Sequence, residues 1–186
     1  MGRVKTVPAT ALEGPERDVY ERAASYGSFG SLLGAMANRP PVMRHTFNLL
    51  LDLADDEVLP KRYLELALVT VSKLNECTYC VSHHAPKLTV TGVSERAALN
   101  VLDYDNEPEF DEVDRLVIEY AILVTEQANR VRDEVFDRLR AQFDDAQITE
   151  LTWRIALCGA FNRFNDVLQN EIEDDVVRID LDADAA

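Results

Sequence analysis

The segment NECTYCVSHHAP, from Asn75 to Pro86, carries the densest set of reactive side chains in the sequence. Cys77 and Cys80 stand three residues apart, and His84 follows the second cysteine by four. Cysteines at this spacing serve as a redox pair, as half of a zinc site or as a structural disulfide. Because these three interpretations predict different functions, the segment decides what the protein is expected to do.

The spacing favours a redox pair on a helix. Each helical residue advances by about 100°, which places His84 between the two sulfurs on one stripe. A histidine one turn beyond Cys80 can accept the thiol proton or stabilise the thiolate, and a helix N-terminus also favours the thiolate. A thiolate beside a second thiol can reduce a peroxide or exchange a disulfide. Tyr79 and His83 fall off this stripe and are expected only to line a pocket.

Zinc and a structural disulfide stay open as alternatives. Cys77, Cys80 and the following histidines are suitable zinc ligands, but the second ligand pair of a zinc site normally comes from a distant segment. The remaining candidates, His45 and Cys158, are flanked by apolar residues, and Cys158 is expected to be a buried small residue. A disulfide across so short a loop would constrain the unfolded chain little. The total of three cysteines is odd, unlike the disulfide framework of a secreted protein.

One acidic residue interrupts the apolar helix that precedes this segment. Residues 63–72 have the sequence YLELALVTVS, which is apolar nearly all round and predicts a buried helix. A carboxyl group in such surroundings is costly unless it is paired, and it is suited to a proton relay. We therefore expect Glu65 to take part in catalysis. The alternative is that Glu65 reaches the surface or pairs with Arg154 or Arg163.

Helical periodicity extends over most of the chain and no segment alternates like a strand, so the predicted fold class is all-α. The chain is expected to form a single domain over residues 1–173, with its catalytic core at about 40–130, followed by an acidic C-terminal tail at 174–186. Helices are predicted over residues 15–26, 40–53, 60–74, from the cysteine segment to near Gly92, from Ser94, and over 109–129, 133–143 and 149–171. A Gly/Ser connection is predicted over 27–34, and the centre of the last helix, 153–164, is expected to be buried.

The charge balance excludes some partners. The 186 residues include 34 acidic and 19 basic ones, which gives a formal net charge of −15. Such a surface repels nucleic acid phosphates and anionic membranes. The sequence has no apolar run long enough to cross a membrane, and its N-terminus has no apolar secretion signal. A cytoplasmic protein without nucleic acid or membrane partners is expected.

The segment Pro60 to Leu99 resembles the AhpD-like / carboxymuconolactone decarboxylase superfamily. In its alkylhydroperoxidase branch a glutamate precedes the first cysteine by twelve residues, and a histidine follows the second by four. Glu65 and Cys77 reproduce the first spacing, and Cys80 and His84 reproduce the second. The resemblance implies an AhpD-like helical bundle that assembles as a homotrimer or hexamer.

The resemblance also implies roles for these residues. Cys80 would attack the peroxide, Cys77 would then form the redox-active Cys77–Cys80 disulfide, and His84 with Glu65 would relay the proton. The implied activity is a thiol-dependent peroxidase acting on alkyl or hydrogen peroxide. It would use no metal and no other cofactor, and a thiol–disulfide protein would supply the electrons.

Two departures qualify the resemblance. Tyr79 stands where the archetypal alkylhydroperoxidase has a histidine, which separates this chain from that enzyme and its lipoyl-protein reductant. The decarboxylase branch lacks the cysteine pair, which argues against lactone decarboxylation. The alternatives to a peroxidase are a zinc-stabilised helical module without turnover and a lyase that would tolerate loss of both cysteines.

Overall fold

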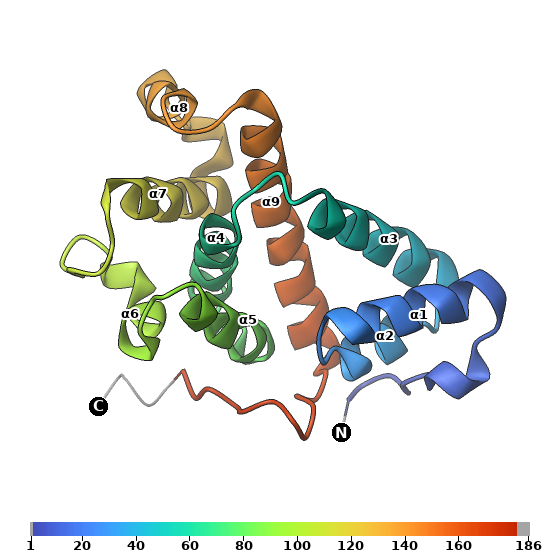
Figure 1. The fold of residues 1–186 in the computed structure, drawn as a ribbon. Coiled ribbons are helices and arrows are strands. Elements are labelled where there is room, and N and C mark those ends of the chain that lie inside the picture. Colours follow the sequence, from blue (N-terminus) through green and yellow to red (C-terminus); the bar gives the residue numbers. More distant parts are fainter. Residues whose placement is uncertain (1, 182–186) are drawn as a thin grey trace. The chain divides into compact units, whose positions relative to one another are not determined.

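The computed structural model describes residues 2–181, and every regular element within that range is a helix (Figure 1). The all-α prediction is therefore confirmed. Contacts divide the described chain into two compact units, one of residues 2–57 and 165–178 and the other of residues 58–164 and 179–181. The single domain over 1–173 stays a prediction, and each unit is described by itself.

The first unit contains three whole α-helices and the end of a fourth, and α1 (Gly14–Tyr26) packs against α3 (Pro40–Asp56). Both of these helices have proline at their first turn, where the missing N–H costs no hydrogen bond. The predicted connection over 27–34 is wrong from Gly30 onward, because a short helix begins there. Leu32 and Leu33 are buried in this helix, and their burial outweighs the low helix propensity of glycine. The helices are α1 Gly14–Tyr26, α2 Gly30–Met36 and α3 Pro40–Asp56.

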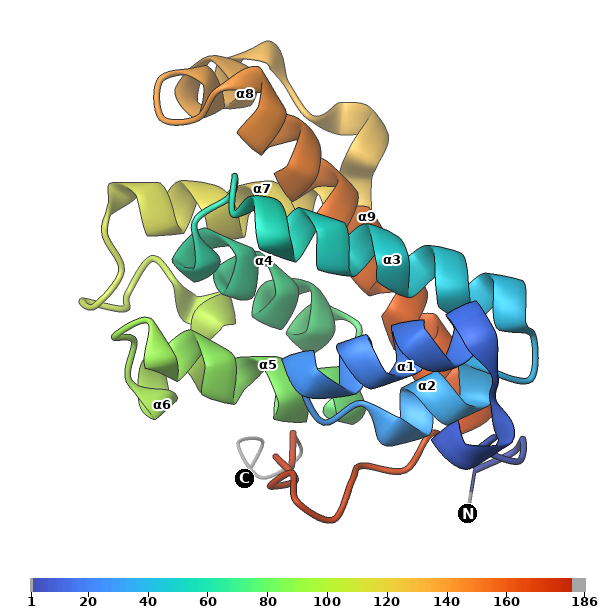
Figure 2. The ribbon, with the colours of Figure 1, turned by 45° about the vertical axis from the view of Figure 1, so that its right-hand side comes forward.

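The second unit is organised around α4 (Lys61–Leu74), which lies between α5 (Thr78–Val90) and α7 (Glu112–Gln127) and contacts both (Figures 1 and 2). All residues from Leu64 to Ser72 are buried, so the prediction that this apolar helix is buried is confirmed. The unit comprises α4 Lys61–Leu74, α5 Thr78–Val90, α6 Glu95–Leu99, α7 Glu112–Gln127, α8 Asp133–Arg140 and most of α9 Asp145–Leu168.

The last helix differs from its prediction at its start and in its burial. It begins at Asp145 rather than Thr149, because Asp144 and Gln147 each accept a hydrogen bond from the other's backbone N–H, at 2.8 and 3.1 Å. Its centre is buried on one side only, so the predicted burial of the whole of 153–164 is wrong. Ile155 and Cys158 are buried, whereas Trp153 is 50% exposed.

The segment after α9 carries no helix within the described residues. Of the predicted acidic tail at 174–186, residues 182–186 lie outside the part that the structure describes. Ile179 donates its backbone N–H to the Ser82 hydroxyl at 2.9 Å, and the side chains of Ile179 and Leu181 pack against the core of the second unit.

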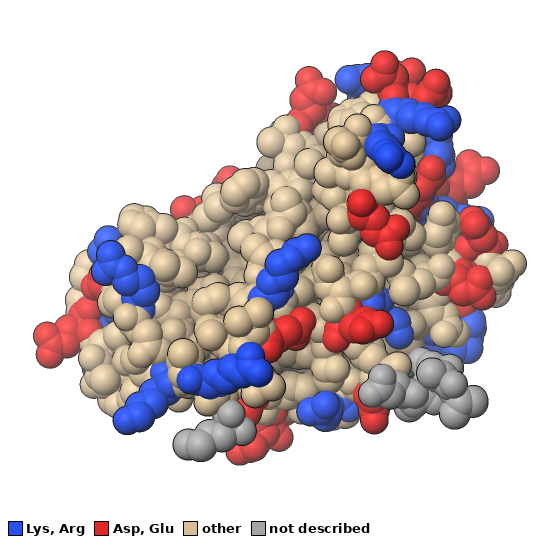
Figure 3. Space-filling view, turned by 180° about the vertical axis from the view of Figure 1, so that it is seen from behind, with Lys and Arg blue, Asp and Glu red and all other residues tan. Residues whose placement is uncertain are grey.

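Surface charges of both signs are interspersed on the face drawn in Figure 3. Within the first unit, Arg22 pairs with Asp52 and Asp55. In the second unit, Arg96 pairs with Glu107 and Glu109. Such pairs neutralise part of the acidic excess locally, while the net charge of −15 remains.

Candidate active site

A tight turn between α4 and α5 brings the cysteines next to the buried helix. Asn75 ends α4, Glu76 adopts the left-handed conformation at φ 54°, and Cys77 is the residue that caps the start of α5. The Cys77 backbone N–H donates to the Ser72 carbonyl at 2.9 Å, and Val81 donates to the Cys77 carbonyl at 3.0 Å. The cysteine segment therefore opens a helix, as predicted, and the turn folds that helix back against α4.

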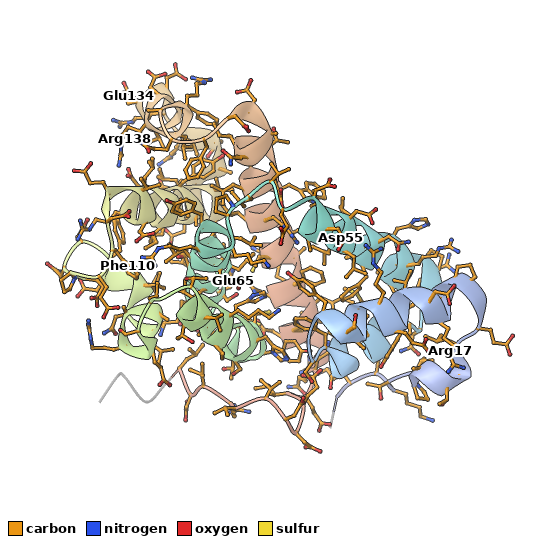
Figure 4. All side chains as sticks on the ribbon, in the orientation of Figure 1. Arg17, Asp55, Glu65, Phe110, Glu134 and Arg138 are labelled. Carbon is orange, nitrogen blue, oxygen red and sulfur yellow. The ribbon has the colours of Figure 1, made fainter. Side chains whose placement is uncertain are left out.

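The structure brings Glu65 and His84 together. The His84 Nδ1–H donates to a Glu65 carboxylate oxygen at 2.8 Å, across the interface between α4 and α5. The Glu65 side chain is 8% exposed and that of His84 is 19% exposed (Glu65 is labelled in Figure 4). The arginines considered as alternative partners have other contacts, because Arg154 pairs with Glu150 and Arg163 donates to the Gly159 carbonyl.

This hydrogen bond determines which nitrogen of His84 can act as a base. Because the Nδ1–H donates its hydrogen bond to Glu65, the neutral ring has its lone pair on Nε2. Cys80 precedes His84 by one helical turn, and side chains four residues apart on a helix are neighbours, with Cβ atoms about 6 Å apart. Cys80 is 5% exposed. A thiol, an imidazole and a carboxylate thus follow one another across α5 and α4.

Tyr79 and His83 form a second pair on α5. The His83 Nδ1–H donates to the Tyr79 carbonyl at 2.6 Å, and the two rings stack with centroids 4.2 Å apart. Both side chains are buried. The stacking fixes the orientation of both rings, while their expected role in lining a pocket stays a prediction.

A half-buried cation that was not among the predicted site residues lies beside this site. Lys87 follows His84 by three residues, so it continues the helical stripe of Cys80 and His84. Burial lowers the pKa of the Lys87 ammonium, and the Arg154 guanidinium acts in the same direction, whereas the Glu65 carboxylate opposes them. The spacing along α5 was the signal that could have identified Lys87 from the sequence.

A second polar cluster lies behind Cys77, on the side of α9. The Cys77 thiol donates to the Asn162 carbonyl at 3.9 Å, and the Asn162 side-chain amide contacts Ser72 and Cys158. Burial raises the pKa of the Cys158 thiol to about 12, so this thiol stays protonated at neutral pH. The expected burial of Cys158 is confirmed. Cys77, Cys80 and Cys158 form no disulfide within the described residues.

Within residues 2–181, no group of three or more His, Cys, Asp or Glu side chains is arranged to hold a metal ion. Over the same residues, no helix is both long and apolar enough to cross a membrane.

Comparisons with known proteins agree with this fold. Residues 40–104 match the carboxymuconolactone decarboxylase family. Escherichia coli (strain K12) protein YnjA is 31% identical over 103 residues, which are 55% of this chain and 57% of YnjA, so the match spans little more than half of that relative.

Two solved structures resemble nearly the whole chain. A peroxidase-related protein from Ralstonia eutropha JMP134, described as an alkylhydroperoxidase AhpD core, has a TM-score of 0.76 at 22% identity and covers 93% of both chains. The debrominase Bmp8 has a TM-score of 0.74 at 20% identity and covers 92% of both chains. At these identities the two similarities establish the fold alone.

Proposed function

We propose that this chain, whose residues 40–104 match the carboxymuconolactone decarboxylase family, is a thiol-dependent peroxidase. It reduces an alkyl or hydrogen peroxide through Cys80 and Cys77, with His84 and Glu65 as the proton relay. The observation that carries this proposal is the 2.8 Å hydrogen bond from His84 to Glu65, one helical turn from Cys80.

In the first step, the His84 Nε2 takes the proton of the Cys80 thiol. The resulting imidazolium lies against the Glu65 carboxylate, which stabilises its charge. The Cys80 thiolate attacks one oxygen of the peroxide, so an S–O bond forms and the O–O bond breaks. The imidazolium returns its proton to the leaving alkoxide, and the products are the Cys80 sulfenic acid and an alcohol, or water from hydrogen peroxide.

In the second step, the Cys77 sulfur attacks the sulfur of the sulfenic acid. The S–S bond forms, the S–O bond breaks, and the hydroxyl group leaves as water with the Cys77 proton. An external dithiol then reduces the Cys77–Cys80 disulfide by exchange and is itself oxidised to a disulfide. We propose a thiol–disulfide protein as this reductant, and dithiothreitol replaces it in the assay.

The central experiment measures consumption of an alkyl hydroperoxide with dithiothreitol. Cys80→Ser is expected to abolish turnover, while Cys77→Ser keeps one stoichiometric oxidation and loses repeated turnover. In the wild type, one equivalent of peroxide should remove two free thiols per chain. An unchanged rate in Cys80→Ser would end the peroxidase proposal. Debromination, the activity named for Bmp8, would then be the next activity to assay.

The proton relay has its own test. His84→Ala is expected to slow the reaction by roughly 10²- to 10⁴-fold, the usual contribution of a general base. Glu65→Gln is expected to slow it less, because the amide oxygen can still accept the Nδ1–H but does not stabilise the imidazolium charge. Glu126→Gln, an exposed position on α7, is the matched control and should leave the rate unchanged.

A further inference from the structure

We propose that Asn162 of α9 is a positioning residue for the second step of the reaction. It holds the Cys77 thiol, and the turn that carries this thiol, in one fixed place for attack on the Cys80 sulfenic acid. The inference rests on the proposed function, because it assigns Asn162 to the resolving cysteine of that reaction. It rests on four contacts made by a residue that is fully buried.

The first contact fixes the thiol itself. The Cys77 S–H donates to the Asn162 backbone carbonyl at 3.9 Å, and both residues are 0% exposed. A carbonyl oxygen accepts a hydrogen bond from a thiol but repels a thiolate, so this contact favours the protonated form of Cys77. The dipole of α5 alone would favour ionisation of Cys77, the residue nearer the helix N-terminus. The carbonyl contact opposes that tendency.

The second contact fixes the turn between α4 and α5. The Asn75 side-chain N–H₂ group donates to the Asn162 Oδ1 at 2.9 Å and to the Val71 carbonyl at 3.0 Å. The next residue, Glu76, has a φ of 54°, which is uncommon for a residue other than glycine. The hydrogen bond between the Asn75 and Asn162 side chains therefore stabilises this turn, and the position of Cys77 depends on the turn.

The other two contacts fix the Asn162 side chain. Its Nδ2 donates to the Ser72 hydroxyl at 3.3 Å and to the Cys158 sulfur at 3.8 Å. The backbone carbonyl of Ser72 also accepts a hydrogen bond from the Cys77 backbone N–H, at 2.9 Å. Asn162 thus uses its amide oxygen as an acceptor and its amide nitrogen as a donor. Aspartate has no such donor and would place a charge beside two buried thiols, so it cannot replace asparagine here.

The test separates the two chemical steps in a single turnover with reduced protein. The first step depends on peroxide concentration, and the second, formation of the disulfide, does not. Asn162→Ala keeps the backbone carbonyl but releases the turn. We expect the second step to slow by about tenfold or more while the first stays within about twofold. The Cys80 sulfenic acid should then persist long enough for dimedone to trap it, as measured by mass spectrometry.

Two further variants show whether a slower second step comes from the loss of the Asn75–Asn162 hydrogen bond. Asn75→Ala removes the donor of the hydrogen bond between the Asn75 and Asn162 side chains. It should therefore slow disulfide formation as Asn162→Ala does, even if Asn162→Ala folds poorly. Asn106→Ala, on an exposed loop of the same unit, is the matched control and should change neither step. Equal slowing of both steps in Asn75→Ala, or an unchanged second step, would overturn the inference. If the wild type itself shows no peroxide-dependent loss of thiols, the proposed function fails, and the role assigned to Asn162 fails with it.

Discussion

Raising the pH should destabilise this protein through Cys158, a thiol that takes no part in the proposed reaction. Its sulfur lies 3.4 Å from the Ser72 hydroxyl and 3.6 Å from the Leu68 carbonyl, and the residue is 4% exposed. Burial raises its pKa from 9.0 to about 12. Because the pKa is higher in the folded state, the stability that the protonated thiol contributes is complete below pH 9 and is lost as the pH rises toward 12.

The size of the effect follows from these values. At pH 10 most unfolded chains have ionised Cys158, whereas the folded chain keeps it protonated. Ionisation therefore stabilises the unfolded state by roughly 1–2 kcal/mol relative to pH 7, because one unit separates the unfolded pKa of 9.0 from the pH. The gain would approach about 4 kcal/mol at pH 12, where the whole difference between the two pKa values counts.

Urea unfolding measures this free energy under reducing conditions at pH 7 and pH 10. Other groups also titrate in this range, so the informative quantity is the difference between wild type and Cys158→Ala. Between the two pH values, the variant should lose roughly 1–2 kcal/mol less unfolding free energy than the wild type. Equal losses in the two proteins would refute the argument. So would rapid modification of native Cys158 by a thiol reagent at pH 8.

Three further predictions concern stability. Arg62→Ala should cost about 3–5 kcal/mol in urea unfolding, because it leaves the fully buried Asp114 carboxylate without its two guanidinium hydrogen bonds; adding Asp114→Asn should recover part of that loss, and no recovery would contradict the pairing. Leu66→Ala, at a 0% exposed position of α4, should cost about 2–5 kcal/mol by calorimetry or denaturant unfolding, and a loss below 1 kcal/mol would contradict its burial. Ser94→Ala removes the hydroxyl that accepts the Ala97 N–H at 3.1 Å and donates to the Glu109 carboxylate at 2.6 Å, so it should cost about 1 kcal/mol in urea unfolding, whereas Ser94→Thr, which keeps a hydroxyl, should retain most of the stability.

The helices could be predicted because their signals are local. Apolar periodicity predicted the long helices, and α1 and α3 both have proline in their first turn, a local signal for a helix start. The prediction failed where tertiary packing outweighed local preference. Burial of Leu32 and Leu33 makes a helix out of a glycine-containing segment, and α9 leaves Trp153 half exposed.

The candidate active site, like the fold, could be predicted from the sequence only in part. Four residues from Cys80 to His84 make one helical turn, so the sequence by itself determined that these side chains are neighbours. The sequence also restricted the partner of Glu65 to a few candidates, since a carboxyl group in an apolar helix needs a partner. It could not choose between His84 and the arginines, because that choice depends on which face of α5 packs against α4.

Only the tertiary structure decided the surroundings of Cys77. Asn162 is 85 residues from Cys77 in the sequence, and nothing in its neighbours along the chain distinguishes it from a surface asparagine. The hydrogen bonds that it makes exist because α9 packs its buried side against the turn between α4 and α5. Local periodicity determines which side of a helix is apolar, but the contacts between distant helices depend on how all the side chains of the core pack together.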